Sequence, residues 1–204
     1  RILCFGDSNT YGHNPATEGR FDETVRWTKQ LSRILGEKYL VVEEGLNSRT
    51  AAITPEDEPY LNGLTYLAPC VRSHQPLDLV ILMLGTNDCK TVFGASADVI
   101  GKGISRLLDQ IQEYAPKAEV LLISPIYLGK KVWQEGYDQE FSRESVTVSR
   151  NLQPVYEKIA RDRQIEFLPA ADHVKCCEAD QEHLNAEGHK KFAEVVYRKL
   201  QKLL

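Results

Sequence analysis

Short apolar runs alternate along the chain with longer stretches in which apolar residues recur at helical spacing. The runs predict strands at residues 1–5, 39–43, 79–84, 120–123 and 165–168. The longer stretches predict helices at residues 24–35, 96–114, 142–163 and 186–203. The run LVILML at 79–84 is apolar throughout, which is typical of a central strand covered on both faces. This alternation predicts βαβ units and a parallel sheet.

Two stretches lack such a pattern. Residues 45–76 contain several prolines and an Asn-Gly pair, which predicts an extended loop with short helical turns. Residues 127–141 predict a second long loop. Long loops often carry binding residues, so both are expected to shape a substrate cleft.

The elements together predict an α/β fold, a three-layer α/β/α sandwich formed by a single domain over residues 1–204. In folds of this kind, ligands bind beyond the carboxyl ends of the strands. Candidate site residues should therefore come directly after predicted strands.

The composition changes this picture little. A net charge of −4 gives no nucleic-acid footprint, and no apolar stretch approaches the length of a membrane span, so neither partner is expected. The five cysteines (Cys4, Cys70, Cys89, Cys176 and Cys177) form an odd set without metal-site spacing. We expect free thiols and a cytoplasmic location. Because the chain begins at Arg1 without Met, an export signal removed earlier stays an open alternative.

Ser8 stands in a Gly-Asp-Ser sequence directly after the first predicted strand. These are turn residues, so the motif is compatible with an ordinary strand end. It is equally compatible with a nucleophilic hydroxyl, which would need a base and an orienting acid. The sequence DQEH supplies both, because Asp180 and His183 are three residues apart and can meet on one turn. Its alternative interpretation is a solvated acidic turn.

A hydrolytic site also needs hydrogen-bond donors for the developing oxyanion. Gly45 follows the second predicted strand and Asn87 the third. The Gly45 N–H, the Asn87 amide and the N–H of Ser8 are the candidate donors, although Gly45 and Asn87 also suit a turn and a helix cap. Asn9, Tyr11 and Trp133 are candidate substrate-binding residues.

These motifs, in this order, resemble the sequence blocks of the SGNH (GDSL-type) hydrolases. The stretches VRWT, EEGLNSRT, LNGLTYLAPC and PLDLVILMLGTND resemble its arylesterase/acyltransferase branch, which includes a mycobacterial acyltransferase. The resemblance implies a flavodoxin-like fold with strand order 2-1-3-4-5 and no metal or organic cofactor. It implies a Ser8–His183–Asp180 triad and an oxyanion hole of Ser8, Gly45 and Asn87. It also implies a serine esterase acting on short-chain acyl esters, aryl or carbohydrate acetates, with acyl transfer as a further activity.

Other classes stay open at this stage. One is a non-catalytic ligand-binding protein of the same fold. Another is a metal-dependent hydrolase using Asp7, Asp88, Asp180 and His183. Apolar residues in the two long loops either pack onto the domain or form the interface of a homo-oligomer; they are Tyr60, Leu61, Leu64, Tyr66, Leu67, Trp133 and Tyr137.

Overall fold

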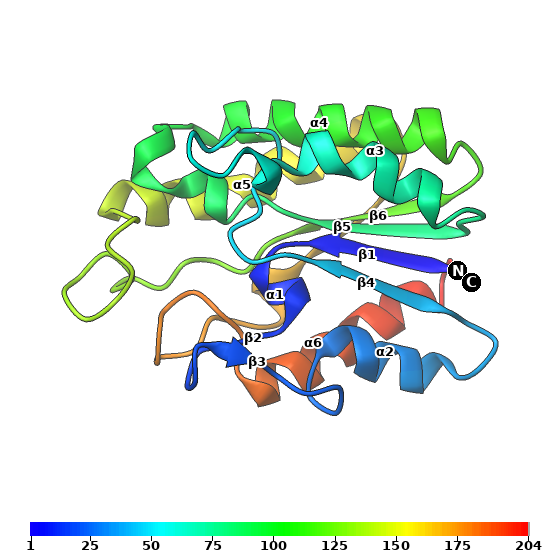
Figure 1. Cartoon of the computed structure of the whole chain (residues 1–204), viewed down its shortest axis with the longest axis horizontal. Helices are drawn as coiled ribbons and strands as arrows, with labels where there is room; N and C mark the ends of the chain where they lie inside the picture. Colours follow the sequence, from blue (N-terminus) through cyan, green and yellow to red (C-terminus); the bar gives the residue numbers. More distant parts are fainter. Residues whose placement is uncertain (204) are drawn as a thin grey trace.

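The computed structural model describes residues 1–203, and its centre is a parallel sheet of five strands (Figure 1). These strands are β1 (Ile2–Gly6), β4 (Val41–Gly45), β5 (Leu79–Met83), β6 (Glu119–Ser124) and β7 (Glu166–Pro169). Their order across the sheet is β4-β1-β5-β6-β7. This is the 2-1-3-4-5 order, so the predicted fold class is confirmed. Leu204, the last residue of the predicted domain, lies outside the described residues.

Helices cover both faces of the sheet (Figure 1). One face carries α2 (Trp27–Leu35) and α6 (Ala186–Leu200), and the other carries α3 (Gly63–Ser73), α4 (Ala97–Tyr114) and α5 (Arg143–Arg163). Side chains along a strand alternate between its two faces. Accordingly, Ile2 and Cys4 of β1 join the core under α2 and α6, whereas Leu3 and Phe5 join the core under the other three helices.

Several short elements complete the chain. They are α1 (Ser8–Tyr11), β2 (His13–Asn14), β3 (Gly19–Arg20) and the 3₁₀ helices η1 (Pro59–Leu61), η2 (Asn87–Cys89), η3 (Thr91–Phe93) and η4 (Ala170–Asp172). The short helix α1 and the β2–β3 pair lie at the end of the sheet where β1 finishes (Figure 1). The N-terminus lies at the opposite end of the sheet.

All four predicted helices are confirmed, with shifted ends that have local causes. Ser96 and Ser142 are N-caps, whose side chains accept hydrogen bonds from Val99 N and Ser145 N, so these helices begin one residue later than predicted. Helix α2 begins at Trp27 because the preceding residues form a turn in which the Asp22 carboxylate accepts from Thr24 N.

The prediction of only short helical turns in residues 45–76 was wrong, because α3 is an 11-residue helix. The Asn-Gly pair starts the helix: the Asn62 side chain is its N-cap and accepts from Leu64 N at 2.9 Å. Pro69 lies inside the helix, where proline is normally unfavourable. Burial of Leu67, Cys70 and Val71 against the sheet stabilises the helix despite Pro69. Residues 127–141 contain neither helix nor strand, as predicted.

The apolar loop residues do not behave as one surface. Leu61 and Leu67 are buried in the domain, whereas Tyr60 and Tyr66 are exposed. All five cysteines are free, in agreement with the sequence-based expectation. Within residues 1–203, none of the helices has the length and apolarity that a membrane crossing requires.

Candidate active site

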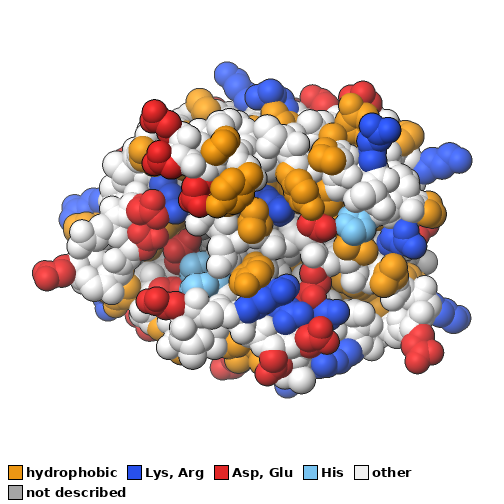
Figure 2. Space-filling model, in the orientation of Figure 1, with side chains coloured by type: hydrophobic (Ala, Val, Ile, Leu, Met, Phe, Trp, Pro, Cys, Tyr) orange, Lys and Arg blue, Asp and Glu red, His pale blue; other side chains and the backbone are white. Residues whose placement is uncertain are grey.

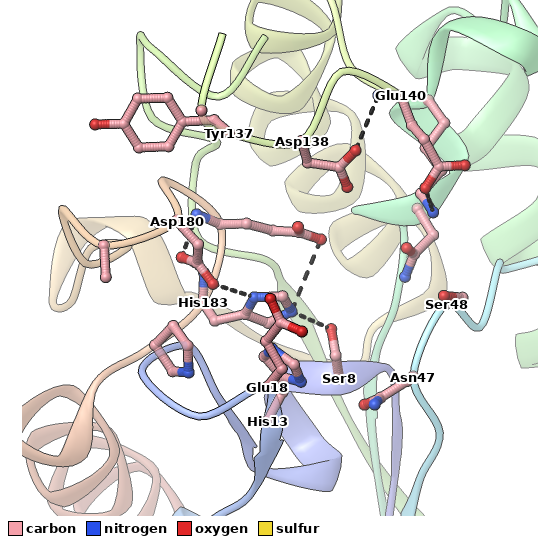
Figure 3. Close-up of a pocket in the computed structure, with 16 residues that line it drawn as sticks. Ser8, His13, Glu18, Asn47, Ser48, Tyr137, Asp138, Glu140, Asp180 and His183 are labelled. Atoms are coloured by element: carbon pink, nitrogen blue, oxygen red, sulfur yellow. Dashed lines mark hydrogen bonds and ion pairs between the residues drawn. The ribbon is translucent and has the colours of Figure 1, made fainter. Parts of the chain in front are cut away.

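A serine, a histidine and an aspartate form a continuous chain of hydrogen bonds at the carboxyl edge of the sheet (Figure 3). Ser8 Oγ lies 2.7 Å from His183 Nε2, and His183 Nδ1 lies 2.6 Å from Asp180 Oδ2. Ser8 and His183 are buried, and they are separated by 175 residues along the chain. This arrangement can pass a proton from the hydroxyl to the imidazole while the carboxylate holds the ring.

The position of Ser8 follows from the way α1 begins. Asp7 is the N-cap, and its carboxylate accepts from Asn9 N at 3.0 Å. The Asn9 side chain then contacts the C-terminal segment: its Oδ1 accepts from Leu184 N at 3.0 Å and its Nδ2 lies 3.5 Å from the Glu182 carbonyl oxygen. These contacts fasten the residues on both sides of His183 to the helix that begins with Ser8.

Asp180 is oriented by its own turn. Its Oδ1 accepts from the backbone N–H groups of Glu182 and His183, both at 3.0 Å. Oδ2 is thereby left facing His183 Nδ1. The DQEH sequence therefore forms a closed local structure and not a loose solvated turn.

The surroundings of His183 and Asp180 shift the pKa values of both side chains in directions that suit a histidine base held by an ionised carboxylate. Burial lowers the pKa of His183, but the hydrogen bond that its Nδ1–H donates to Asp180 and the charges of Glu182 and Asp180 outweigh burial and hold this pKa above its ordinary value. Burial also raises the pKa of Asp180, and the hydrogen bond to His183 and the charge of that ring overcome it, lowering the pKa to about 2. Asp180 is therefore ionised at neutral pH.

A cavity of about 580 Å³ opens above Ser8. In Figure 2 its mouth is a hollow on the left of the molecule, with acidic and histidine side chains around it. Asn47, Ser48 and Asn87 also line the cavity. In Figure 3, Ser8 lies between His183 and the segment that carries Asn47 and Ser48. The volume is in the range of small-molecule sites.

The comparisons with known proteins agree with this geometry. The profile of the GDSL-like Lipase/Acylhydrolase family matches residues 4–191, which is most of the chain. The chain belongs to this family. This acylhydrolase is a carboxylic ester hydrolase, and its partner is a small-molecule ester substrate. No match was found among curated protein sequences.

Several solved structures share the whole fold of the acylhydrolase. The inhibitor-bound aryl esterase of M. smegmatis is 34% identical over 100% of this chain and 99% of that chain, with a TM-score of 0.93. A carbohydrate acetylesterase from Sinorhizobium meliloti is also 34% identical, covers 100% and 99% of the two chains and has a TM-score of 0.92. A putative arylesterase from Agrobacterium tumefaciens is 30% identical over 100% and 99%, with a TM-score of 0.88.

The acylhydrolase does not place Gly45 in the cavity. Strand β4 extends two residues further than predicted, and Gly45 is its last residue, paired in register with Gly6 of β1. A Cβ atom on Gly45 would lie 2.1 Å from the Tyr11 backbone nitrogen. The glycine therefore allows α1 to pack closely on β4, and Ser48, three residues later, reaches the cavity instead.

The three candidate substrate-binding residues lie outside the cavity lining of the described chain. Asn9 is buried and joins α1 to the His183 segment, as described above. The Arg20 guanidinium lies over the Tyr11 ring, with Arg20 Cζ 4.3 Å from the ring centroid. Trp133 donates its Nε1–H to the Lys130 carbonyl. Tyr137, four residues after Trp133, does line the cavity.

The acylhydrolase has two groups of residues within residues 1–203 whose spacing could hold a metal ion: His13 with Asp180 and His183, and Glu44 with Cys70 and His74. The ligand set expected for a metal-dependent hydrolase included Asp7 and Asp88, and the described structure places neither in these groups. Asp88 accepts instead from Ala51 N at 2.8 Å. Burial raises the pKa of Asp7 to about 6 and that of Asp88 to about 7.

Ser48 and Glu182 are among the cavity residues that the sequence analysis did not single out. Ser48 lies three residues after Gly45, in the segment that follows β4. Glu182 lies between two residues that drew attention as a pair, and its carboxyl is buried beside the imidazole. An acidic residue directly before the candidate base is the signal that would have revealed it.

Proposed function

We propose that this chain is a serine esterase that hydrolyses short-chain acyl esters through an acyl-serine intermediate. The observation that carries the proposal is the 2.7 Å contact between Ser8 Oγ and His183 Nε2 at the floor of the cavity. A general base must be within hydrogen-bond reach of the proton it removes, and this distance meets that requirement.

The reaction has two halves. Ser8 Oγ attacks the ester carbonyl carbon as His183 Nε2 takes the hydroxyl proton, and His183 then gives that proton to the leaving alcohol oxygen. The acyl group stays on Ser8. A water molecule next attacks the acyl-serine with His183 again as base, which releases the carboxylic acid and restores Ser8. An alcohol in place of water would give acyl transfer.

Three donors are suited to hold the oxyanion. Within residues 1–203, the N–H groups of Ser8 and Ser48 have no protein acceptor, and both residues line the cavity. The Asn87 amide uses one of its two hydrogens on the Arg49 carbonyl at 3.1 Å, so the other is available. We therefore assign the oxyanion hole to Ser8, Ser48 and Asn87, with Ser48 in the place first given to Gly45.

Replacing Asn87 with alanine tests this assignment. Loss of one oxyanion donor is expected to lower kcat on phenyl acetate by on the order of 10²–10³, with little change in KM. The reason is that the donor acts on charge that develops only in the transition state. Asn151→Ala, on the exposed face of α5, serves as the control and should keep full activity. An effect of Asn87→Ala confined to KM would remove it from the oxyanion hole.

The substrate class is supported by the relatives, one described as an aryl esterase and another as a carbohydrate acetylesterase. A series of p-nitrophenyl esters from acetate to octanoate, with acetylated sugars alongside, tests the class. We expect kcat/KM to be highest for acetate and to fall with each lengthening of the acyl chain. A maximum at octanoate would contradict the short-chain assignment.

A further inference from the structure

The cavity above Ser8 is strongly acidic. Five carboxylates line it, and Lys90 is the single lysine or arginine among its lining residues in the described chain; the acids are Glu18, Asp138, Glu140, Asp180 and Glu182. Two of the five carboxylates already have a partner of opposite charge or a hydrogen-bonded histidine. Lys90 Nζ lies 2.6 Å from Glu140 Oε2, and Asp180 holds His183. The other three have no lysine or arginine partner within residues 1–203.

Glu182 is the most deeply placed of these three. Its side chain is 8% exposed, and its Oε1 lies 3.8 Å from His183 Nε2. Its side chain makes no hydrogen bond to another group in residues 1–203. Burial raises the pKa of Glu182 to about 7. Beside the neutral imidazole that acts as base, the buried Glu182 carboxylate has no compensating positive charge, and a cation brought next to it would relieve that cost.

The position of Glu182 relative to the reaction is fixed by His183. In the proposed mechanism, Nε2 delivers the proton to the oxygen of the leaving alcohol. Because Glu182 Oε1 lies 3.8 Å from that same nitrogen, the Glu182 carboxyl lies close to the atom that protonates the leaving alcohol. Glu18 and Asp138 belong to the same cavity and add negative charge around that path.

We propose that Glu182 makes this cavity selective for esters whose leaving alcohol carries a positively charged ammonium group. This inference rests on the proposed function and adds the substrate's charge to it. An ammonium group within a few ångströms of the carboxylate is attracted in a partly desolvated site, whereas a carboxylate-bearing alcohol is repelled.

A pair of substrates of the same shape isolates the charge. Acetylcholine and 3,3-dimethylbutyl acetate differ in that a trimethylammonium group replaces a tert-butyl group. We would measure kcat/KM for both by acid release at pH 8, where Glu182 is mostly ionised, and compare their ratio. The state of His183 affects both substrates equally, so it cancels from this ratio.

The expected wild-type ratio favours acetylcholine by about 10- to 100-fold. Glu182→Gln, which keeps the shape and removes the charge, should lower the ratio by most of that factor. Glu135→Gln is the matched control, because Glu135 is exposed and lies outside the cavity lining of the described chain. It should leave the ratio unchanged.

Two results would overturn the inference. A ratio near one, measured on the wild type alone, would show that the ammonium charge does not affect the reaction. An equal change on both substrates in Glu182→Gln would show that the residue acts only through His183. Phenyl acetate is measured in parallel as a test of esterase activity. If phenyl acetate is hydrolysed but acetylcholine is not preferred over 3,3-dimethylbutyl acetate, the charge selectivity alone is rejected. Loss of activity on every ester rejects the proposed function as well.

Discussion

Replacing Ser8 with alanine is expected to lower kcat on phenyl acetate by on the order of 10⁶. Ser8 Oγ is the atom that forms the acyl bond in the proposed mechanism, and alanine leaves His183 with no hydroxyl to activate. The remaining oxyanion donors and the cavity give only a small residual rate. Steady-state kinetics with a correction for spontaneous hydrolysis measures the loss.

A buried serine elsewhere at the same edge of the sheet supplies the control. Ser124 ends β6, and its Oγ has no hydrogen-bond partner within residues 1–203, so Ser124→Ala should keep its activity. A fluorophosphonate should label the wild type and this control at Ser8 and leave Ser8→Ala unlabelled. A Ser8→Ala variant within tenfold of the wild type would reject Ser8 as the nucleophile. An unlabelled but folded wild type would favour the non-catalytic binding protein.

Replacing Asp180 with asparagine is expected to lower kcat by about 10⁴ at neutral pH. In the wild type, Asp180 Oδ1 accepts two backbone N–H groups and Oδ2 faces His183 Nδ1. An asparagine oxygen would keep the two backbone hydrogen bonds, which turns its NH₂ group toward Nδ1. Nδ1 must then accept, so the neutral ring carries its proton on Nε2 and cannot take the proton of Ser8.

The measurement is kcat on phenyl acetate at neutral pH, together with the melting temperature of the variant. Because the backbone hydrogen bonds are kept, the fold should be little affected while kcat falls. Asp172→Asn is the matched control, since Asp172 is an exposed carboxylate that accepts hydrogen bonds from the Gln153 side chain and lies outside the cavity lining of the described chain. A loss below tenfold in Asp180→Asn would show that the carboxylate is dispensable for orienting His183.

The raised pKa of His183 bears on both experiments. The free imidazole must be neutral to accept a proton, so activity should decline as the pH falls through a pKa that lies above the ordinary value for histidine. Comparisons between variants are therefore most informative on the alkaline side of that value, where the wild-type ring is neutral.

The acidic residues that line the cavity come from distant parts of the chain. The acidic lining combines residues of the β2–β3 hairpin region, the 127–141 loop and the DQEH turn. In the sequence these acids are scattered among many exposed ones. Only their convergence over Ser8 makes them a single electrostatic environment. The charge of the preferred substrate could therefore not be predicted from the sequence.

The sequence by itself determined the features whose physics is local. Apolar runs specified the five strands, because a strand covered on both faces needs apolar residues throughout. The pairing of Asp180 with His183 follows from a spacing of three residues within one turn. The Asp7 cap places Ser8 at the start of a helix directly after a strand. The order of these motifs along the chain carried the resemblance to the GDSL-type hydrolases, and that resemblance predicted ester hydrolysis.

Tertiary structure decided which neighbours those motifs meet. The register of β4 on β1 placed Gly45 against the backbone of α1 and carried Ser48 to the cavity. Packing against the sheet made α3 a helix despite Pro69. Contacts of Asn9 with the segment around His183 join the N-terminal serine motif to the C-terminal histidine motif, where Glu182 is buried. Each outcome depends on distant residues meeting in space, and no local spacing encodes that.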